Sequence, residues 1–135
     1  MTKKTSETFF VSSTIKKGNS YLKELPFKVI KEQVIGKSFI LNLILIGDKK
    51  SRNLNRKFRN INKTSNILSF PLSKDQGDMF LNVRQAEREF SKYEMPRGEF
   101  IIYLFIHGLL HLKGMAHSSR MEKEERRILE GYKRK

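Results

Sequence analysis

RGEFIIYLFIHGLLHLKG, residues 97–114, is a nearly continuous apolar segment bounded by Pro96 and Gly114. Proline suits the start of a helix, because its fixed φ is already helical and the first turn does not need its missing N–H group. Glycine suits the residue just beyond a helix, where the backbone often turns left-handed. The segment therefore predicts a helix that ends at Gly114 and lies in the core of the protein.

The three histidines of the chain follow in this segment, within HGLLHLKGMAH, residues 107–117. On a helix, His107 and His111 lie one turn apart on the same face, with Cβ atoms roughly 5 to 6 Å apart. The turn at Gly114 lets His117 approach them from outside the helix. Three imidazoles that leave one position open for water are typical of a catalytic metal site. The alternative is that His107 and His111 are core histidines satisfied by ordinary hydrogen bonds, with His117 on the surface.

Two further features limit the chemistry. The chain has no cysteine, so disulfides and thiolate metal sites are excluded and only His, Asp and Glu remain as strong metal ligands. Metalloproteases of the His-Glu-x-x-His type place a general base directly after the first histidine, and here that position is Gly108. Ordinary metalloprotease chemistry is therefore disfavoured.

The charge of the chain indicates an anionic partner. Lys+Arg 28 against Asp+Glu 14 gives 28 − 14 = +14, with a pI near 10.1. A phosphate backbone is the partner that this charge favours, and a membrane surface is the alternative. No apolar run reaches the roughly 18 residues of a spanning helix, and the N-terminal residues lack the apolar region of a signal peptide. We therefore expect a cytoplasmic protein.

The remaining patterns predict a single domain, residues 1–135, of the α+β class, with a small mixed sheet of about four strands and about five helices. The order and pairing of the strands stay open. The predicted strands are residues 8–13, 38–47, 66–72 and 78–83. The predicted helices are residues 19–36 interrupted at Pro26, 49–60 capped by Asp48, 84–93, 97–114, and a last one from Ser119 with Gly131 beyond its end.

Three motifs resemble those of a known family, the bacterial YbeY endoribonucleases. HGLLHLKGMAH is similar to the signature His-Gly-x-Leu-His-Leu-x-Gly-Tyr-Asp-His of that family. LNRKFRNINKTSNILSFPL resembles its stretch with Leu-Asn, an aromatic, an Arg and Thr-Asp-Val-Leu-Ser-Phe-Pro, and GDMFLNVRQAERE resembles its Gly-Asp-Ile strand and following helix. The resemblance covers residues 41–129 and implies a zincin-like single domain.

The resemblance also implies roles for individual residues. His107, His111 and His117 match the ligands of one Zn²⁺ per chain, and Arg59 matches a catalytic basic residue that lines the substrate cleft. A guanidinium near a metal could hold the scissile phosphate and offset the charge of the transition state; the alternative for Arg59 is a solvated charge at a helix end. The basic residues that we expect to contact nucleic acid are Arg52, Arg56, Lys57, Arg59 and Lys63.

The function implied is a metal-dependent, single-strand-specific endoribonuclease that acts in maturation of small-subunit ribosomal RNA and in ribosome quality control. Its expected partners are ribosomal RNA and components of the small ribosomal subunit, without membrane, DNA or small-molecule cofactor. The first alternative is a non-catalytic ribosome-assembly factor that zinc stabilises and that binds ribosomal RNA. The second is a small metal-dependent peptidase, which Gly108 disfavours.

The chain departs from the family pattern at two pairs of positions. Met115 and Ala116 stand where the family usually has Tyr-Asp, and Ser65 and Asn66 stand where it usually has Thr-Asp. The segment after His117 is also shorter than in the family. Loss of two carboxylates predicts weaker orientation of the imidazoles, looser metal binding and weaker catalysis.

Overall fold

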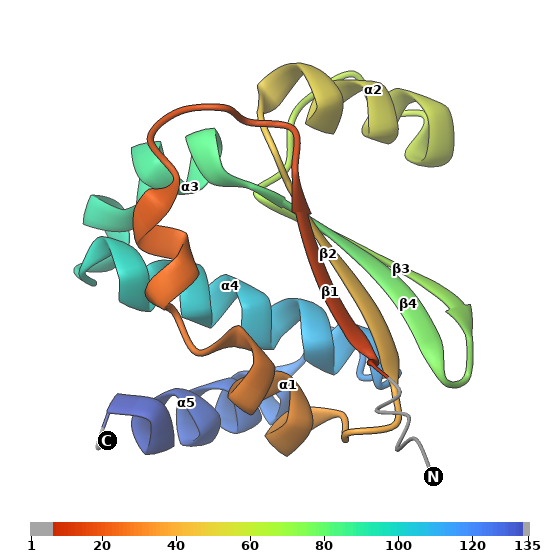
Figure 1. Ribbon diagram of the computed structural model, residues 1–135, viewed down its shortest axis with the longest axis vertical. Helices are drawn as coiled ribbons and strands as arrows, with labels where there is room; N and C mark the ends of the chain where they lie inside the picture. Colours follow the sequence, from red (N-terminus) through yellow and green to blue (C-terminus); the bar gives the residue numbers. More distant parts are fainter. Residues whose placement is uncertain (1–6, 134–135) are drawn as a thin grey trace, which may run out of the picture.

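A four-stranded sheet runs through the middle of the molecule, with helices on both of its faces (Figure 1). The structure is a computed structural model that describes residues 7–133. In chain order its elements are β1 (Phe9–Ser13), η1 (Ser20–Glu24), α1 (Phe27–Val34), β2 (Ile40–Ile46), α2 (Asp48–Arg59), β3 (Ile67–Ser73), β4 (Gln76–Asn82), α3 (Val83–Glu89), η2 (Phe90–Tyr93), α4 (Arg97–Leu112) and α5 (Ser119–Lys133).

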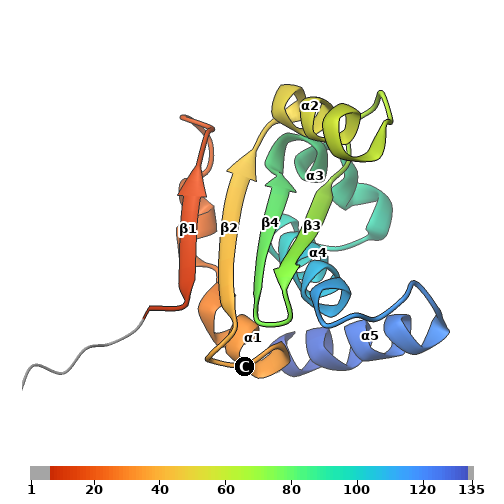
Figure 2. The same cartoon turned by 90° about the vertical axis from the view of Figure 1, so that its right-hand side faces the viewer.

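The sheet is mixed, and its strand order is β1-β2-β4-β3 (Figure 2). β1 pairs in parallel with β2, and β2 in parallel with β4. β3 pairs with β4 in antiparallel fashion through a tight hairpin, so β1 and β3 form the two edges. The predicted α+β class is confirmed, with a mixed sheet and, within residues 7–133, five α-helices.

The main core lies between the sheet and α4, which packs beneath one face together with α1 and α5 (Figure 1). Because side chains alternate along a strand, Leu41, Leu43 and Leu45 of β2 all point to this face and are buried. The ring of Phe105 on α4 meets that of Phe27 on α1 at 4.9 Å between centroids. α4 is thus the buried helix that its apolar sequence predicts.

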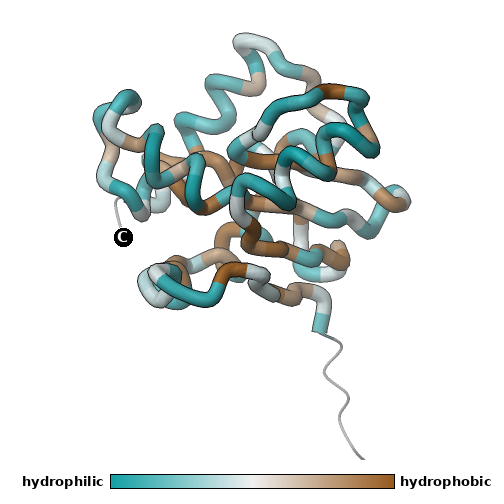
Figure 3. Tube along the Cα trace, turned by 90° about the horizontal axis from the view of Figure 1, so that it is seen from above, coloured by the Kyte–Doolittle hydropathy of each residue, from teal (hydrophilic) through white to brown (hydrophobic). Residues whose placement is uncertain are grey.

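A second, smaller core lies on the opposite face, under α2. Ile46 of β2, Leu54 of α2 and Leu68 of β3 form it. Apart from the exposed Phe58, the rest of α2 is polar and basic. In Figure 3 the hydrophobic stretches gather inside the molecule, and the hydrophilic stretches lie mainly around them.

The ends of the helices bear out two predictions and correct two. The helix predicted after residue 19 is divided at Pro26 into η1 and α1, and Gly114 has φ +95 just beyond α4. The cap predicted at Asp48 is wrong: Gly47 is the N-cap residue, and Asp48 is the first residue of α2. Gly131 does not lie beyond α5, which continues to Lys133. A single glycine in a helix costs about 1 kcal/mol relative to alanine, which the packing of α5 outweighs.

The Asp48 carboxylate ties α2 to the helix that follows β4. It pairs with Arg88 of α3 at 2.9 Å and accepts a hydrogen bond from Asn82 Nδ2 at 3.0 Å. The hydrogen bond from Arg88 is the largest cause that lowers the pKa of Asp48. These long-range partners explain why the side chain does not cap its own helix.

The structure also bears on membrane insertion. Within residues 7–133, no helix has both the length and the apolar character that are needed to cross a bilayer.

Candidate metal centre

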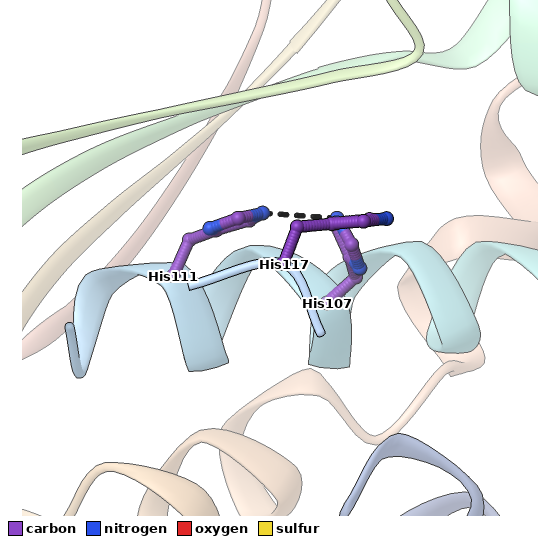
Figure 4. Close-up of side chains that lie close together, drawn as sticks. All are labelled: His107, His111 and His117. Atoms are coloured by element: carbon purple, nitrogen blue, oxygen red, sulfur yellow. Dashed lines mark hydrogen bonds between the residues drawn. The ribbon is translucent and has the colours of Figure 1, made fainter. Parts of the chain in front are cut away.

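The three histidines come together at the C-terminal end of α4 (Figure 4). His107 and His111 project from successive turns of this helix, and His117 projects from the segment that follows the turn at Gly114. Each offers a ring nitrogen, and these nitrogens all lie within 4.8 Å of one another. The predicted convergence of His107, His111 and His117 is confirmed, and the cluster could hold a metal ion.

The separation of the ring nitrogens fits a shared ion. His107 Nε2 and His111 Nε2 lie 3.1 Å apart. Two nitrogens that bind one tetrahedral ion at about 2.0 to 2.1 Å lie roughly 3.3 Å from each other, so these two rings need little movement. Burial, followed by the nearby His107 and His117, lowers the pKa of His111. The neutral form that binds metal is thereby favoured.

A buried carboxylate lies behind the cluster. Glu125 of α5 is 2% exposed, and its Oε2 contacts His107 Nδ1. Burial and, after it, the Glu125 carboxylate raise the pKa of Tyr103 to about 12, so this hydroxyl of α4 stays protonated beside Glu125. A carboxylate on Nδ1 holds the histidine in the tautomer whose Nε2 is free to bind metal.

Glu125 was not predicted as a site residue, although the sequence carries a signal for it. Met121, Glu125 and Leu129 repeat every fourth residue, and all three are buried on the inner side of α5. An acidic residue in an apolar stripe is costly to bury without a partner. An acidic residue in such a position indicates that a cationic or hydrogen-bonding group on a neighbouring element contacts it. Here that group is His107 of α4.

The close packing around Gly108 explains why a glycine follows the first histidine. A Cβ atom at this position would lie 2.8 Å from Met79 Cε and 2.9 Å from Ser69 Oγ. Ser69 of β3 donates a hydrogen bond to the Gly108 carbonyl at 3.2 Å, which joins the edge strand to the histidine-bearing turn of α4. No room remains here for the glutamate of a His-Glu-x-x-His protease, which agrees with the interpretation that peptidase chemistry is disfavoured.

Gly108→Ala is expected to destabilise the protein by about 1 to 3 kcal/mol, because the added methyl forces β3 and α4 apart in a filled core. Denaturation by urea, followed by circular dichroism, measures the change. Gly131→Ala is the matched control, since nothing lies within 4 Å of a Cβ at that position of α5. The control should gain about 0.5 to 1 kcal/mol from helix propensity. Equal effects of the two substitutions would contradict this packing.

The structure does not bring Arg59 into contact with the histidines among the residues it describes. Arg59 ends α2, on the other face of the sheet from α4, and its Nη1 donates to Asn55 Oδ1 at 3.3 Å (Figure 1). The buried Asn55 in turn donates to the Lys63 carbonyl and to Ser65 Oγ, which fixes the loop before β3. β3 therefore links the two regions, since Leu68 packs under α2 while Ser69 meets α4.

The other basic residues expected to bind nucleic acid lie near Arg59. Arg52, Arg56 and Lys57 project from α2, Lys63 lies in the loop that follows, and all are exposed. Arg56 Nε donates to Asn62 Oδ1 at 3.0 Å. They form a basic surface on this side of the sheet, but their role as nucleic-acid contacts stays a prediction.

Asn66 and Ala116, which stand where the family usually has aspartates, form hydrogen bonds with nearby residues. The Asn66 side chain donates to Glu89 Oε1 of α3 at 3.0 Å, so a carboxylate stands next to the position that lacks one. Ala116 is exposed, and its carbonyl accepts a hydrogen bond from Ser118 Oγ that helps to start α5. The orientation of His107 rests on Glu125 instead.

Fold and site together define a small α+β domain with a candidate histidine metal centre and a strongly basic surface. The solution structure of TM1509 from Thermotoga maritima is similar, with a TM-score of 0.65 and 25% identity over 90% of this chain and 87% of that one.

Sequence comparison identifies the family. The family model described as Endoribonuclease YbeY matches residues 5–134. The endoribonuclease YbeY of Buchnera aphidicola is 33% identical, over 82% of this chain and 79% of the relative. That of Thermodesulfovibrio yellowstonii is 31% identical, over 91% and 87%. The chain belongs to the YbeY family, as its motifs predicted.

Proposed function

We propose that this protein is a metal-dependent endoribonuclease that cleaves single-stranded RNA. The observation that carries the proposal is the cluster of three imidazoles, whose nitrogens lie within 4.8 Å of one another in a chain of the YbeY family. The net charge of +14 supports a polyanionic substrate. RNA rather than DNA is proposed from the names of the relatives.

The metal proposed for the site is zinc, held by His107, His111 and His117. Three neutral imidazoles without a thiolate suit Zn²⁺, and a catalytic zinc site keeps a fourth position open. When bound, such an ion supplies Lewis-acid polarisation of a phosphoryl oxygen and lowers the pKa of bound water. The protein contributes the orientation of the rings and favours the neutral form of His111.

Arg59 is proposed to hold the phosphate group. Its guanidinium presents paired N–H groups that match two phosphate oxygens. Because Arg59 and the histidines lie on opposite faces of the sheet, the RNA is proposed to pass around the free edge of β3. Ser69 and Leu68 make this strand a short bridge between the two faces.

Glu125→Gln is expected to lower zinc affinity about 10- to 100-fold, because the neutral amide no longer fixes and polarises His107. Competition with a chromogenic chelator measures the affinity, and the ¹⁵N shifts of His107 report its tautomer. Glu122→Gln, an exposed acid on the same helix, is the control and should bind zinc as the unchanged protein does. Unaltered affinity and tautomer in Glu125→Gln would refute a positioning role.

RNA affinity is expected to fall steeply as salt rises, since each neutralised phosphate releases counterions. Loss of about three cations from residues 49–63 should lower the slope of log affinity against log salt by roughly 2 units, with no new sequence preference. Fluorescence anisotropy with a labelled single-stranded RNA between 50 and 200 mM salt, the range that separates such contacts, provides the measurement. A flat dependence would argue against phosphate contacts.

A role in maturation of small-subunit ribosomal RNA and in ribosome quality control, with small-subunit components as partners in the cytoplasm, is also part of the proposal. The alternative is an assembly factor in which zinc holds α4 and α5 together and RNA binding is the whole function. The contact between Glu125 of α5 and His107 of α4 supports this alternative, because it already joins the two helices at the histidine cluster. Single-turnover cleavage of ribosomal RNA with and without chelator separates the two, because an assembly factor binds RNA but leaves it intact.

A further inference from the structure

We infer that Phe58 is a stacking platform for an unpaired base of the bound RNA. This inference rests on the proposed single-stranded substrate and adds a residue that recognises it. The relevant surface is the aromatic row, which consists of Phe58, Phe70 and Phe80.

The aromatic row is built from three separate elements. Phe58 of α2 lies 5.4 Å from Phe70 of β3 between ring centroids, and Phe70 lies 5.8 Å from Phe80 of β4. Strand alternation places Phe70 on the same face as Leu68, which pairs across the strands with Phe80. Phe70 of β3 therefore supports the ring of Phe58, and Phe80 of β4 in turn supports Phe70.

Phe58 nevertheless remains open to solvent. Leu54, one turn earlier on α2, is 8% exposed, whereas Phe58 is 57% exposed. A lone exposed apolar residue is common and needs no explanation. A large ring that packs on a second ring, itself backed by a third, and still presents most of its surface is different, because it offers a held apolar face to a flat ligand.

The charges around Phe58 indicate which flat ligand fits. Lys57 Nζ lies 5.3 Å from the centre of the Phe58 ring. The other cations of α2 are Lys49, Lys50, Arg52, Arg56 and Arg59, and all are exposed. Among the described residues, none of these six cations forms a salt bridge with an acid. An aromatic ring among free cations matches a chain of flat bases joined by phosphates.

Asp78, which lies beside the middle ring of the aromatic row, limits the platform to Phe58. Phe70 pairs across the strands with Asp78, whose Oδ1 accepts a hydrogen bond from Asn42 at 3.0 Å. A carboxylate there disfavours a phosphate backbone. The RNA is therefore expected to leave Phe58 toward Arg59 and the basic end of α2.

Stacking on Phe58 would select unpaired RNA. In a duplex each base already stacks on its neighbours, so its flat face is not available to a protein ring. A single strand exposes these faces, and any base can stack because each has a π-face. Phe58 thus gives a reason for single-strand preference without sequence preference.

The direct test uses Phe58→Trp, which introduces the single tryptophan of a chain that has none. Single-stranded oligoadenylate should quench the tryptophan fluorescence on binding, whereas an abasic oligonucleotide of the same length should not. Base-paired RNA should quench it far less than the single strand. Equal quenching by oligoadenylate and the abasic strand, or no quenching although anisotropy shows binding, would overturn the inference.

A second variant tests the effect on affinity. Phe58→Ala should weaken binding of oligoadenylate about tenfold and leave the salt dependence unchanged, because stacking releases no counterions. Phe10→Ala is the matched control, since Phe10 is 43% exposed on β1 at the other edge of the sheet. Its affinity should not change. Melting curves check that both variants are folded.

The outcomes also separate this inference from the proposed function. If the protein cleaves RNA and Phe58→Ala binds as tightly as the unchanged protein, the platform is wrong and the nuclease stands. If it cleaves no RNA while base-dependent quenching persists, the nuclease is wrong and the platform stands. If Phe58→Ala changes only the mass in sedimentation, from dimer to monomer, the surface binds a second copy and the inference is overturned.

Discussion

His111→Ala is expected to release the metal and to remove RNA cleavage completely. Loss of a partner that merely orients a ligand lowers metal affinity about 10- to 100-fold, so loss of a ligand itself should have a larger effect. His111 Nε2 lies 3.1 Å from His107 Nε2, and two remaining imidazoles leave the ion weakly held. Elemental analysis of the purified variant and single-turnover cleavage measure both losses together.

The control for this substitution lies two residues further along. Lys113→Ala removes an exposed side chain just beyond α4 and should retain both metal and cleavage. RNA binding by His111→Ala should stay close to that of the unchanged protein, since the basic surface of α2 is untouched. A variant that keeps cleavage after losing His111 would remove this histidine from the mechanism.

Arg59→Ala is expected to lower the single-turnover cleavage rate about a hundredfold, which corresponds to about 3 kcal/mol, while RNA binding changes little. The reason is that the proposed contact of Arg59 strengthens as charge develops in the transition state, whereas a general backbone contact acts equally on the bound RNA and on the transition state. Binding and cleavage are measured on one RNA. Zinc content should be unchanged, because Arg59 contacts Asn55 rather than a histidine.

Arg56→Ala is the matched control, one turn earlier on the same basic helix. It should weaken RNA binding slightly and should not lower the cleavage rate of the bound RNA. If Arg59→Ala loses binding and cleavage in equal proportion, Arg59 is an ordinary phosphate contact. The assembly-factor alternative then gains support.

Local patterns predicted most of the fold. The buried helix from Pro96 to Gly114, the break at Pro26 and the convergence of the three histidines all depend on residues within a few turns of each other. Periodicity and backbone preference act over that range. The pairing of the strands could not be predicted, because β2 and β4 pair through residues that lie far apart in the sequence.

The errors and omissions share a physical cause. Asp48 has the residue type of a helix cap, yet Arg88 and Asn82, which are distant in sequence, compete for its carboxylate. In the sequence, Glu125 is one of several charged residues of an amphipathic helix. Only the packing of α5 against α4 brings it into contact with His107. Arg59 was expected to line the substrate cleft, which stays a prediction, and its place at the end of α2, across the sheet from α4 (Figure 1), could not be read from the sequence. Each depends on tertiary packing, which one sequence does not reveal.

The most direct measurement is a zinc titration of the metal-free protein that follows bound metal and single-turnover cleavage of a single-stranded RNA in the same samples. Both should rise together and level off at about one ion per chain, since the three histidines form one site. Full cleavage by protein without bound metal, or one tightly bound ion with no cleavage at any concentration of RNA, would contradict metal-dependent catalysis at His107, His111 and His117.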